Sequence, residues 1–288
     1  MPDAIPPDAW KVAGVSGDAG SEEAVVKLAI IGDATGLADR AADAGLEVLC
    51  FATSEGEGEA LEGRGHRLVE AWTDFFEALE APRIYLLDLP LGERLDAVID
   101  EGSAVMEPGD VLVDPGGSWW CDTLRRYRRL RHRALYFVDV ALFGEGEAAL
   151  LLASGDPSGV DIALPALRKL IAPGRARAFG SAGAAHYARM VGDGVATALA
   201  QAHSEAVQLM EAWPGEADLE VVRSLWPFED MPPTPRDSWL LDDAVRLEAA
   251  VPLLAQAVML RLAERLDAHS SEPPAPRVGG FGLPEDIR

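Results

Sequence analysis

Short apolar runs separated by helix-forming segments occupy the first part of this sequence of 288 residues. The runs lie at 25–31, 47–52, 83–89, 111–114 and 134–140, and a sixth candidate lies at 148–153. Helical composition is found between them, at 37–44, 61–80 and 121–132 and in the segment ending at Met106. Strands that are buried on both faces read as continuous apolar runs, and their alternation with helices is typical of parallel sheets. The sequence therefore predicts a doubly wound α/β sheet over residues 25–175.

The pattern changes after Pro173. From 184 to 213, apolar residues recur at intervals of three and four with few helix breakers, which predicts one long helix. Further helices are predicted at 216–226 and 242–269. We therefore expect an all-helical region over 176–269. The Pro- and Gly-rich ends, 1–24 and 270–288, are expected to be flexible tails.

The charge of the chain narrows its possible partners. A formal net charge of -23 repels phosphate backbones and anionic lipid, so we expect neither a nucleic-acid nor a membrane partner. One dense basic run, Arg125–Arg133, has two interpretations. It is either a patch that binds nucleic acid or phosphate, with Tyr127 interleaved, or a solvated helix face that offsets the acidic surface. The net charge favours the second interpretation.

The two cysteines, Cys50 and Cys121, provide neither a disulfide framework nor a metal-ligand spacing, so no metal site is predicted. No run approaches the ~18 uninterrupted apolar residues of a membrane span. These features predict a cytoplasmic protein. From the doubly wound sheet we expect its ligand to be a small molecule.

Three local patterns point beyond the fold. Val111–Asp122 reads VLVDPGGSWWCD, Gly183–Gly194 reads GAAHYARMVGDG, and Ser238–Asp242 reads SWLLD. Their order and spacing resemble the 6-phosphogluconate dehydrogenase family. Its members carry D-G-G-N-S before two aromatics, a basic residue and Asp, and G-x-G-H-x-x-K-M-V-H-N-G at the start of a long central helix. The resemblance covers about residues 25–245. It implies a Rossmann-type NAD(P)-binding domain followed by an all-α domain, and a dimer assembled through the long helix.

The resemblance also implies roles for single residues. The general base of the family is a lysine on the central helix, and Arg189 stands in its place. A guanidinium, with a pKa above ~12, does not accept a proton near neutral pH. The acid of the family, a glutamate, is replaced by Ala196, whereas Ser118 keeps the serine of the turn signature. We therefore expect a chain that is inactive on 6-phosphogluconate.

Positions that hold the substrate in the family differ as well. Its His-Asn pair is replaced by Gly192-Asp193, and the Ser-Gly-Gly that grips the substrate carboxylate is replaced by 143–145 (FGE). A glutamate beside a carboxylate substrate is repulsive. Arg189 and Asp193 lie four residues apart on the predicted helix. Their interpretation stays open between an ordinary ion pair and a remade polar site that binds an anion and transfers protons.

The glycine loop of the dinucleotide site is altered. Where the family has G-x-G-x-x-G, this chain has GDATG at 32–36, one residue shorter and with an acidic residue near the diphosphate. After the second apolar run, Thr53 and Ser54 stand where the family offers an arginine to the 2′-phosphate of NADP. No acidic residue ends that run to bind the ribose of NAD. The resemblance implies NADP or NAD as cofactor, held by Gly32, Thr35, Gly36, Thr53, Ser54 and Pro90.

Two functions are compatible with these residues. The first is a diverged NAD(P)-dependent oxidoreductase, with Arg189, Asp193 and Ser118 as the candidate catalytic residues. The second is a non-catalytic pseudoenzyme that acts as a binding or assembly partner. The resemblance implies a homodimer, and a heterodimer with an active homologue suits the second function. His186 matches a histidine of the family and is expected to be a packed structural residue.

Overall fold

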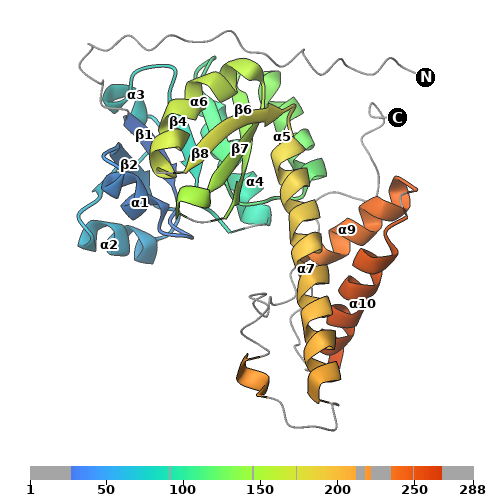
Figure 1. Ribbon diagram of the computed structural model, residues 1–288. Coiled ribbons are helices and arrows are strands. Elements are labelled where there is room, and N and C mark those ends of the chain that lie inside the picture. Colours follow the sequence, from blue (N-terminus) through green and yellow to red (C-terminus); the bar gives the residue numbers. More distant parts are fainter. Residues whose placement is uncertain are drawn as a thin grey trace, which may run out of the picture.

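The computed structural model describes residues 27–90, 92–144, 146–172, 174–211, 218–221, 235–248 and 250–267. The predicted tails at 1–24 and 270–288, and most of the helix predicted at 216–226, lie outside these residues. An α/β unit carries a group of long helices that extends away from it (Figure 1). None of the described helices is long and apolar enough to cross a membrane.

The eight described strands form one sheet in the order β3-β2-β1-β4-β5-β6-β7-β8. Their bounds are β1 Lys27–Ile31, β2 Glu47–Phe51, β3 Arg67–Leu68, β4 Ile84–Leu87, β5 Val111–Asp114, β6 Tyr136–Phe143, β7 Leu150–Gly155 and β8 Arg175–Gly180. Neighbouring strands are parallel except for the antiparallel pair β6 and β7. The strand order reverses beside β1, which separates β2 from β4. Doubly wound sheets bind their ligands at such a switch point.

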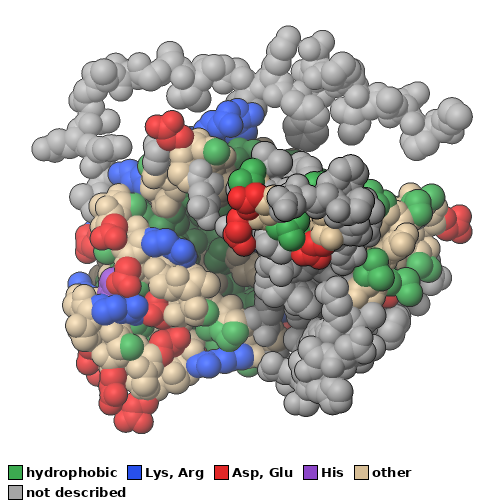
Figure 2. All heavy atoms as spheres, turned by 60° about the horizontal axis from the view of Figure 1, so that its bottom comes forward, with side chains coloured by type: hydrophobic (Ala, Val, Ile, Leu, Met, Phe, Trp, Pro, Cys, Tyr) green, Lys and Arg blue, Asp and Glu red, His purple; other side chains and the backbone are tan. Residues whose placement is uncertain are grey.

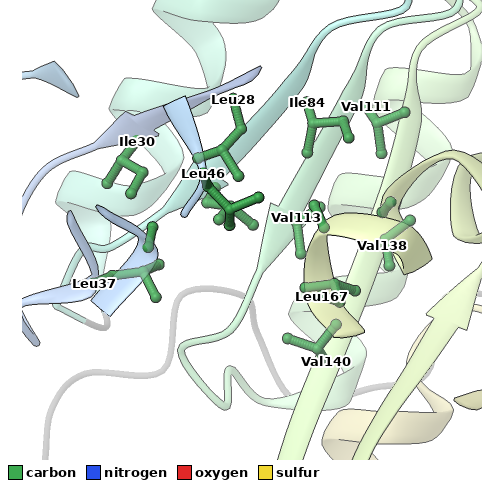
Figure 3. Close-up of a cluster of buried hydrophobic side chains, with 14 of the residues drawn as sticks. Leu28, Ile30, Leu37, Leu46, Ile84, Val111, Val113, Val138, Val140 and Leu167 are labelled. Atoms are coloured by element: carbon green, nitrogen blue, oxygen red, sulfur yellow. The ribbon is translucent and has the colours of Figure 1, made fainter. Parts of the chain in front are cut away.

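Helices cover both faces of the sheet. Their bounds are α1 Leu37–Asp43, α2 Glu55–Gly63, α3 Asp74–Ala78, α4 Glu93–Val105, α5 Trp120–Arg131 and α6 Pro157–Leu170, with a 3₁₀ turn at Gly146–Ala148. Leu28 and Ile30 of β1 belong to the apolar cluster under α1 and α6, where Leu167 of α6 faces the strands (Figure 3). Ala29 and Ile31 belong to the opposite cluster, under α3 and α4. Burial of both faces explains why the strands read as continuous apolar runs.

The remaining long helices are α7 Ala184–Glu211, α9 Pro235–Arg246 and α10 Pro252–Asp267. Met190 of α7, Leu240 of α9 and Val258 of α10 are buried together and form a separate small core. Gly194 permits this packing, because a Cβ at that position would clash with the side chain of Leu240. The predicted fold class, a Rossmann-type α/β sheet followed by helices around one long helix, is confirmed.

Two helix predictions are wrong in extent. The segment 242–269 is interrupted between α9 and α10, where Glu248 has a positive φ of 53° and Pro252 starts the new helix. The segment 61–80 contains the end of α2, then β3, then α3. Gly65 has a φ of 88°, a conformation that ends the helix and returns the chain to the sheet. Two further elements, α6 and β8, were not predicted.

Candidate functional site

A cavity of about 310 Å³ opens at the carboxyl ends of the central strands. Thr35 after β1, Asp88 after β4 and Gly116 after β5 line it, together with Leu142 of β6 and Leu167 of α6. The cavity therefore lies at the switch point of the sheet. Acidic and basic side chains are interspersed over the α/β part of the face shown in Figure 2.

The turn after β1 brings two backbone segments into close contact. The N–H of Asp88 donates to Ile31 O at 2.9 Å, and the N–H of Ala34 donates to Asp88 O at 2.9 Å. Gly32 has a φ of 83°, and a Cβ there would lie 2.5 Å from the carbonyl oxygen of Asp88. Only glycine fits this position. The glycine at position 32 of the altered loop therefore has a direct steric reason.

The side chain of Asp88 holds the next part of the turn. Its carboxylate accepts the N–H of Thr35 at 3.0 Å, the N–H of Leu37 at 3.0 Å and the hydroxyl of Thr35 at 2.8 Å. Asp88 is 2% exposed. In Rossmann-type sheets the backbone N–H groups of this turn bind the pyrophosphate. In this chain they bind an internal carboxylate, a contact that the sequence signalled only as an acidic residue within an apolar run.

A second carboxylate joins the turns after β1 and β2. Glu57 of α2 accepts the N–H of Asp33 at 2.9 Å and the hydroxyl of Thr53 at 2.9 Å, and it also accepts the N–H of Thr53. From α4, Arg94 donates to the carbonyl oxygen of Thr53 at 2.6 Å and to its hydroxyl. Ser54 is exposed at the start of α2. Sequence reasoning missed these contacts of Glu57 and Arg94, because the expected positions lay at the strand end itself.

The acidic residue of the glycine loop is also paired. Asp33 forms an ion pair with Arg64, which contacts Asp39 at 3.0 Å. His66 lies 2.6 Å from Asp39, and this hydrogen bond lowers the pKa of the Asp39 carboxyl. Arg64 thus places a positive charge beside the carboxylate that the sequence predicted near a diphosphate.

The other predicted cofactor residues have simpler surroundings. Gly36 precedes α1 with a φ of 69° and would meet no atom with a Cβ, so its conformation alone favours glycine. Pro90 is exposed just after β4. The structure brings Gly32, Gly36 and Thr35 together in one turn and places Thr53 beside that turn through Glu57.

Ser118 is held in a buried polar network. Its hydroxyl donates to Asp114 at 2.8 Å and accepts from the guanidinium of Arg126 at 2.9 Å. Arg126 in turn donates to Asp96 of α4 at 3.0 Å. Ser118 is 4% exposed. The network joins α4, α5 and the turn after β5, so the hydroxyl already has a donor and an acceptor within the protein.

Arg189 and Asp193 form the ion pair that their spacing allows. Nε of Arg189 donates to Asp193 at 2.8 Å, and Nη1 donates to the carbonyl oxygen of Leu142 at 2.8 Å. Leu142 lines the cavity, so this carbonyl links the cavity to α7. Ala196 is half-buried further along the same helix.

An aromatic ring fills the space beside this ion pair. A Cβ at Gly192 would lie 2.8 Å from Cε1 of Phe143, so the ring packs directly on the backbone of α7. By the resemblance, both positions carry polar side chains that hold the substrate in the family. The two replacements fit each other here, because the small residue makes room for the large one.

His186 and the basic run have structural partners. His186 is 1% exposed, with Nδ1 2.7 Å from the Thr123 hydroxyl and Nε2 3.1 Å from Asp114 O. The expectation of a packed structural histidine is confirmed. In α5, Arg125 pairs with Asp96 at 3.1 Å. Arg129 of the same helix pairs with Asp100 of α4 at 2.9 Å. These pairs support the interpretation of the basic run as a helix face.

Comparison with known proteins gives the family. A model described as the NAD binding domain of 6-phosphogluconate dehydrogenase matches residues 24–177. The chain is 29% identical over 210 residues to the decarboxylating 6-phosphogluconate dehydrogenase 1 of Saccharomyces cerevisiae, which is 68% of this chain and 42% of that protein. It is 31% identical over 200 residues to the Salmonella typhimurium enzyme, which is 65% of this chain and 42% of that protein. The chain thus spans less than half the length of these curated relatives.

Among solved structures, 3-hydroxyisobutyrate dehydrogenase of Mycobacterium tuberculosis superposes with a TM-score of 0.65. The identity is 17%, and the superposition covers 84% of this chain and 94% of that one, so the likeness shows the fold.

The predicted cofactor class, NAD or NADP, is confirmed by the match to an NAD-binding domain. The turns fit a dinucleotide. Gly32 lets the backbone of Asp88 lie against the first turn, and the contacts of Asp88 and Glu57 show that several backbone N–H groups there are directed at acceptor oxygens.

Proposed function

This chain belongs to the 6-phosphogluconate dehydrogenase family, and from that premise we propose that it is a diverged NAD(P)-dependent oxidoreductase that is inactive on 6-phosphogluconate. The observation that carries the proposal is the state of Arg189. Its Nε donates to Asp193, and its Nη1 donates to the carbonyl oxygen of Leu142. A guanidinium stays protonated at neutral pH, so Arg189 cannot accept the proton of a sugar hydroxyl.

The substrate side supports the same proposal. The contact between Phe143 and Gly192 puts an apolar ring where a polyhydroxy acid needs polar partners. Ala196 supplies no proton. We infer that the substrate is less polar than a sugar acid. Arg189 would bind an anionic group of this substrate, and the carboxyl group of Asp193 would transfer the proton. A bound nicotinamide cofactor would supply hydride transfer, while Gly32, Thr35 and Glu57 would hold it.

A second candidate is a non-catalytic binding or assembly partner. The contact of Asp88 with Thr35 and Leu37 favours it, because a dinucleotide must displace that carboxylate to use the same donors. We propose that either form is cytoplasmic, since both cysteines are free and buried.

We also propose a homodimer assembled through the helices. Val245 is 80% exposed, Leu253 is 68% exposed and Met259 is 64% exposed, all on α9 and α10. Val245 and Met259 also line one hollow, and exposed apolar side chains that lie together mark interaction surfaces. A heterodimer with an active homologue is the alternative for the non-catalytic role. Sedimentation of the purified chain, alone and with that homologue, separates the two.

Calorimetric titration with NAD(H) and NADP(H) tests the proposed function, together with an assay of NADPH formation from 6-phosphogluconate. We expect binding of a dinucleotide and no turnover of 6-phosphogluconate. Robust turnover would overturn the proposal. The absence of binding at millimolar dinucleotide would instead favour the non-catalytic partner.

A further inference from the structure

We propose that Glu57 makes this chain select NAD(H) over NADP(H), an inference that rests on the proposed dinucleotide-dependent function. Glu57 projects from the first turn of α2 to the turns after β1 and β2. It therefore lies beside the switch point, although it is not the last residue of β2.

The position of the carboxylate follows from its hydrogen bonds. One oxygen of Glu57 accepts the N–H of Asp33, and the other accepts the N–H and the hydroxyl of Thr53. Asp33 and Glu57 are separated by 24 residues. In Rossmann-type sheets an acidic residue about 20 residues after the glycine loop binds the ribose hydroxyls of NAD. Glu57 lies at a similar separation, and its carboxylate reaches the turns after β1 and β2 from a helix.

The same contacts disfavour a 2′-phosphate. The N–H groups of Asp33 and Thr53 are donors that a phosphate at this place would need, and Glu57 holds both. A phosphate would also meet a carboxylate at short range, and two negative charges that are only partly solvated repel each other. A ribose hydroxyl, in contrast, can donate to the lone pair of the Glu57 carboxylate that remains beside its three hydrogen bonds.

Arg94 is the residue that would reverse this preference. Its guanidinium contacts the carbonyl oxygen and the hydroxyl of Thr53, and the side chain is otherwise exposed. A guanidinium beside Thr53 has the charge and the spare donors to bind a phosphate once the opposing carboxylate is neutral. The pair Glu57 and Arg94 thus forms a coenzyme selector, with Glu57 dominant in the natural chain.

The test compares the dissociation constants of NAD⁺ and NADP⁺ by calorimetry in the full chain and in matched variants. We expect the natural chain to bind NAD⁺ about tenfold or more tightly than NADP⁺, since removing one such repulsion changes affinity on that order. E57Q should bring the ratio close to one. E57D, which keeps the charge, should keep the preference for NAD⁺. E59Q, which removes the same charge from an exposed site on α2, should leave the ratio unchanged.

A double variant tests the role of Arg94. Adding R94A to E57Q should remove the gain in NADP⁺ affinity while leaving NAD⁺ affinity within about twofold. Thermal unfolding of each variant checks that the fold persists. The ratio of the two dissociation constants in the natural chain is a test that does not depend on any variant. A natural preference for NADP⁺, or a ratio that E57Q leaves unchanged, would overturn this inference and leave the proposed function standing. Absence of binding to both dinucleotides would overturn both.

Discussion

At the first turns of two helices, backbone N–H groups donate to a buried carboxylate from another part of the sheet. The surroundings of the two carboxylates differ. At α7, Asp139 of β6 accepts the N–H groups of Gly183, Ala185 and His186 at 2.8 to 3.1 Å. At α1, Asp88 accepts the N–H groups of Thr35 and Leu37 at 3.0 Å. Both carboxylates are almost fully buried, at 0% and 2% exposure.

The difference lies in what else can reach the donors. Asp139 also accepts the hydroxyl of Ser154 at 2.7 Å, and every donor around it is buried. Thr35, in contrast, is exposed and lines the cavity with Asp88. Similar hydrogen bonds therefore stabilise a fixed junction at α7, whereas at α1 they occupy donors that a ligand can approach.

The largest expected effect comes from removing the carboxylate at α7. Asp139→Ala leaves several buried donors without an acceptor, and each unmatched donor costs about 1–3 kcal/mol. We expect the free energy of unfolding to fall by about 4 kcal/mol in urea denaturation, with Asp139→Asn intermediate. A loss below about 1 kcal/mol would show that water replaces the carboxylate, and the contrast with α1 would disappear.

Asp122 of α5 is a third buried carboxyl group, and its effect on stability is expected to depend on pH. Burial raises the pKa of Asp122 from 3.8 to about 6. Between about pH 4 and pH 6 the folded protein holds more protons at this site than the unfolded chain, so stability falls as pH rises through that window. Asp122→Asn should therefore raise stability by about 1 to 2 kcal/mol at pH 7 and change nothing below pH 4. An equal gain at both pH values would mean that ionisation is not the cause.

At α1 the same type of substitution should act mainly on ligand binding. Asp88→Asn keeps the shape of the side chain and weakens its hold on Thr35 and Leu37. We expect a stability loss of about 1 kcal/mol and about fivefold tighter dinucleotide binding, because the internal competitor is removed. Thermal unfolding and calorimetry measure the two effects. Unchanged affinity would show that a dinucleotide does not compete with Asp88.

The smallest effect is expected at a partly exposed pair. Arg189 is about one third exposed, and solvent screens its contact with Asp193. Arg189→Gln should therefore lower the unfolding free energy by about 0.5 kcal/mol. Urea denaturation at low and high salt measures this loss. A much larger loss at both salt concentrations would show that solvent does not screen the pair, as it does not screen the buried carboxylates.

The sequence predicted the parts of the fold that rest on local patterns. The strands β1, β4 and β5 are continuous apolar runs because both of their faces are buried. By contrast, β8 was missed because its arginines are exposed, and α6 was missed because it contains Pro165. Local patterns therefore identify the central strands better than an edge strand with exposed charges or a helix that contains a proline.

The candidate site was predictable only in its glycine turn. Asp88 lies 53 residues from Thr35, and Arg94 lies 41 residues from Thr53. These contacts depend on the order of the strands, which brings β4 beside β1, and no periodicity records that order. An acidic residue inside an apolar run was the one visible signal for Asp88.

The two edges of the sheet bear on the solubility of this protein. One edge strand, β3, has two residues, and the other, β8, exposes Arg175 and Arg177. Short and charged edges resist the addition of strands from other molecules. The edges therefore protect the sheet from aggregation during folding and storage, at the places where its backbone groups are least covered.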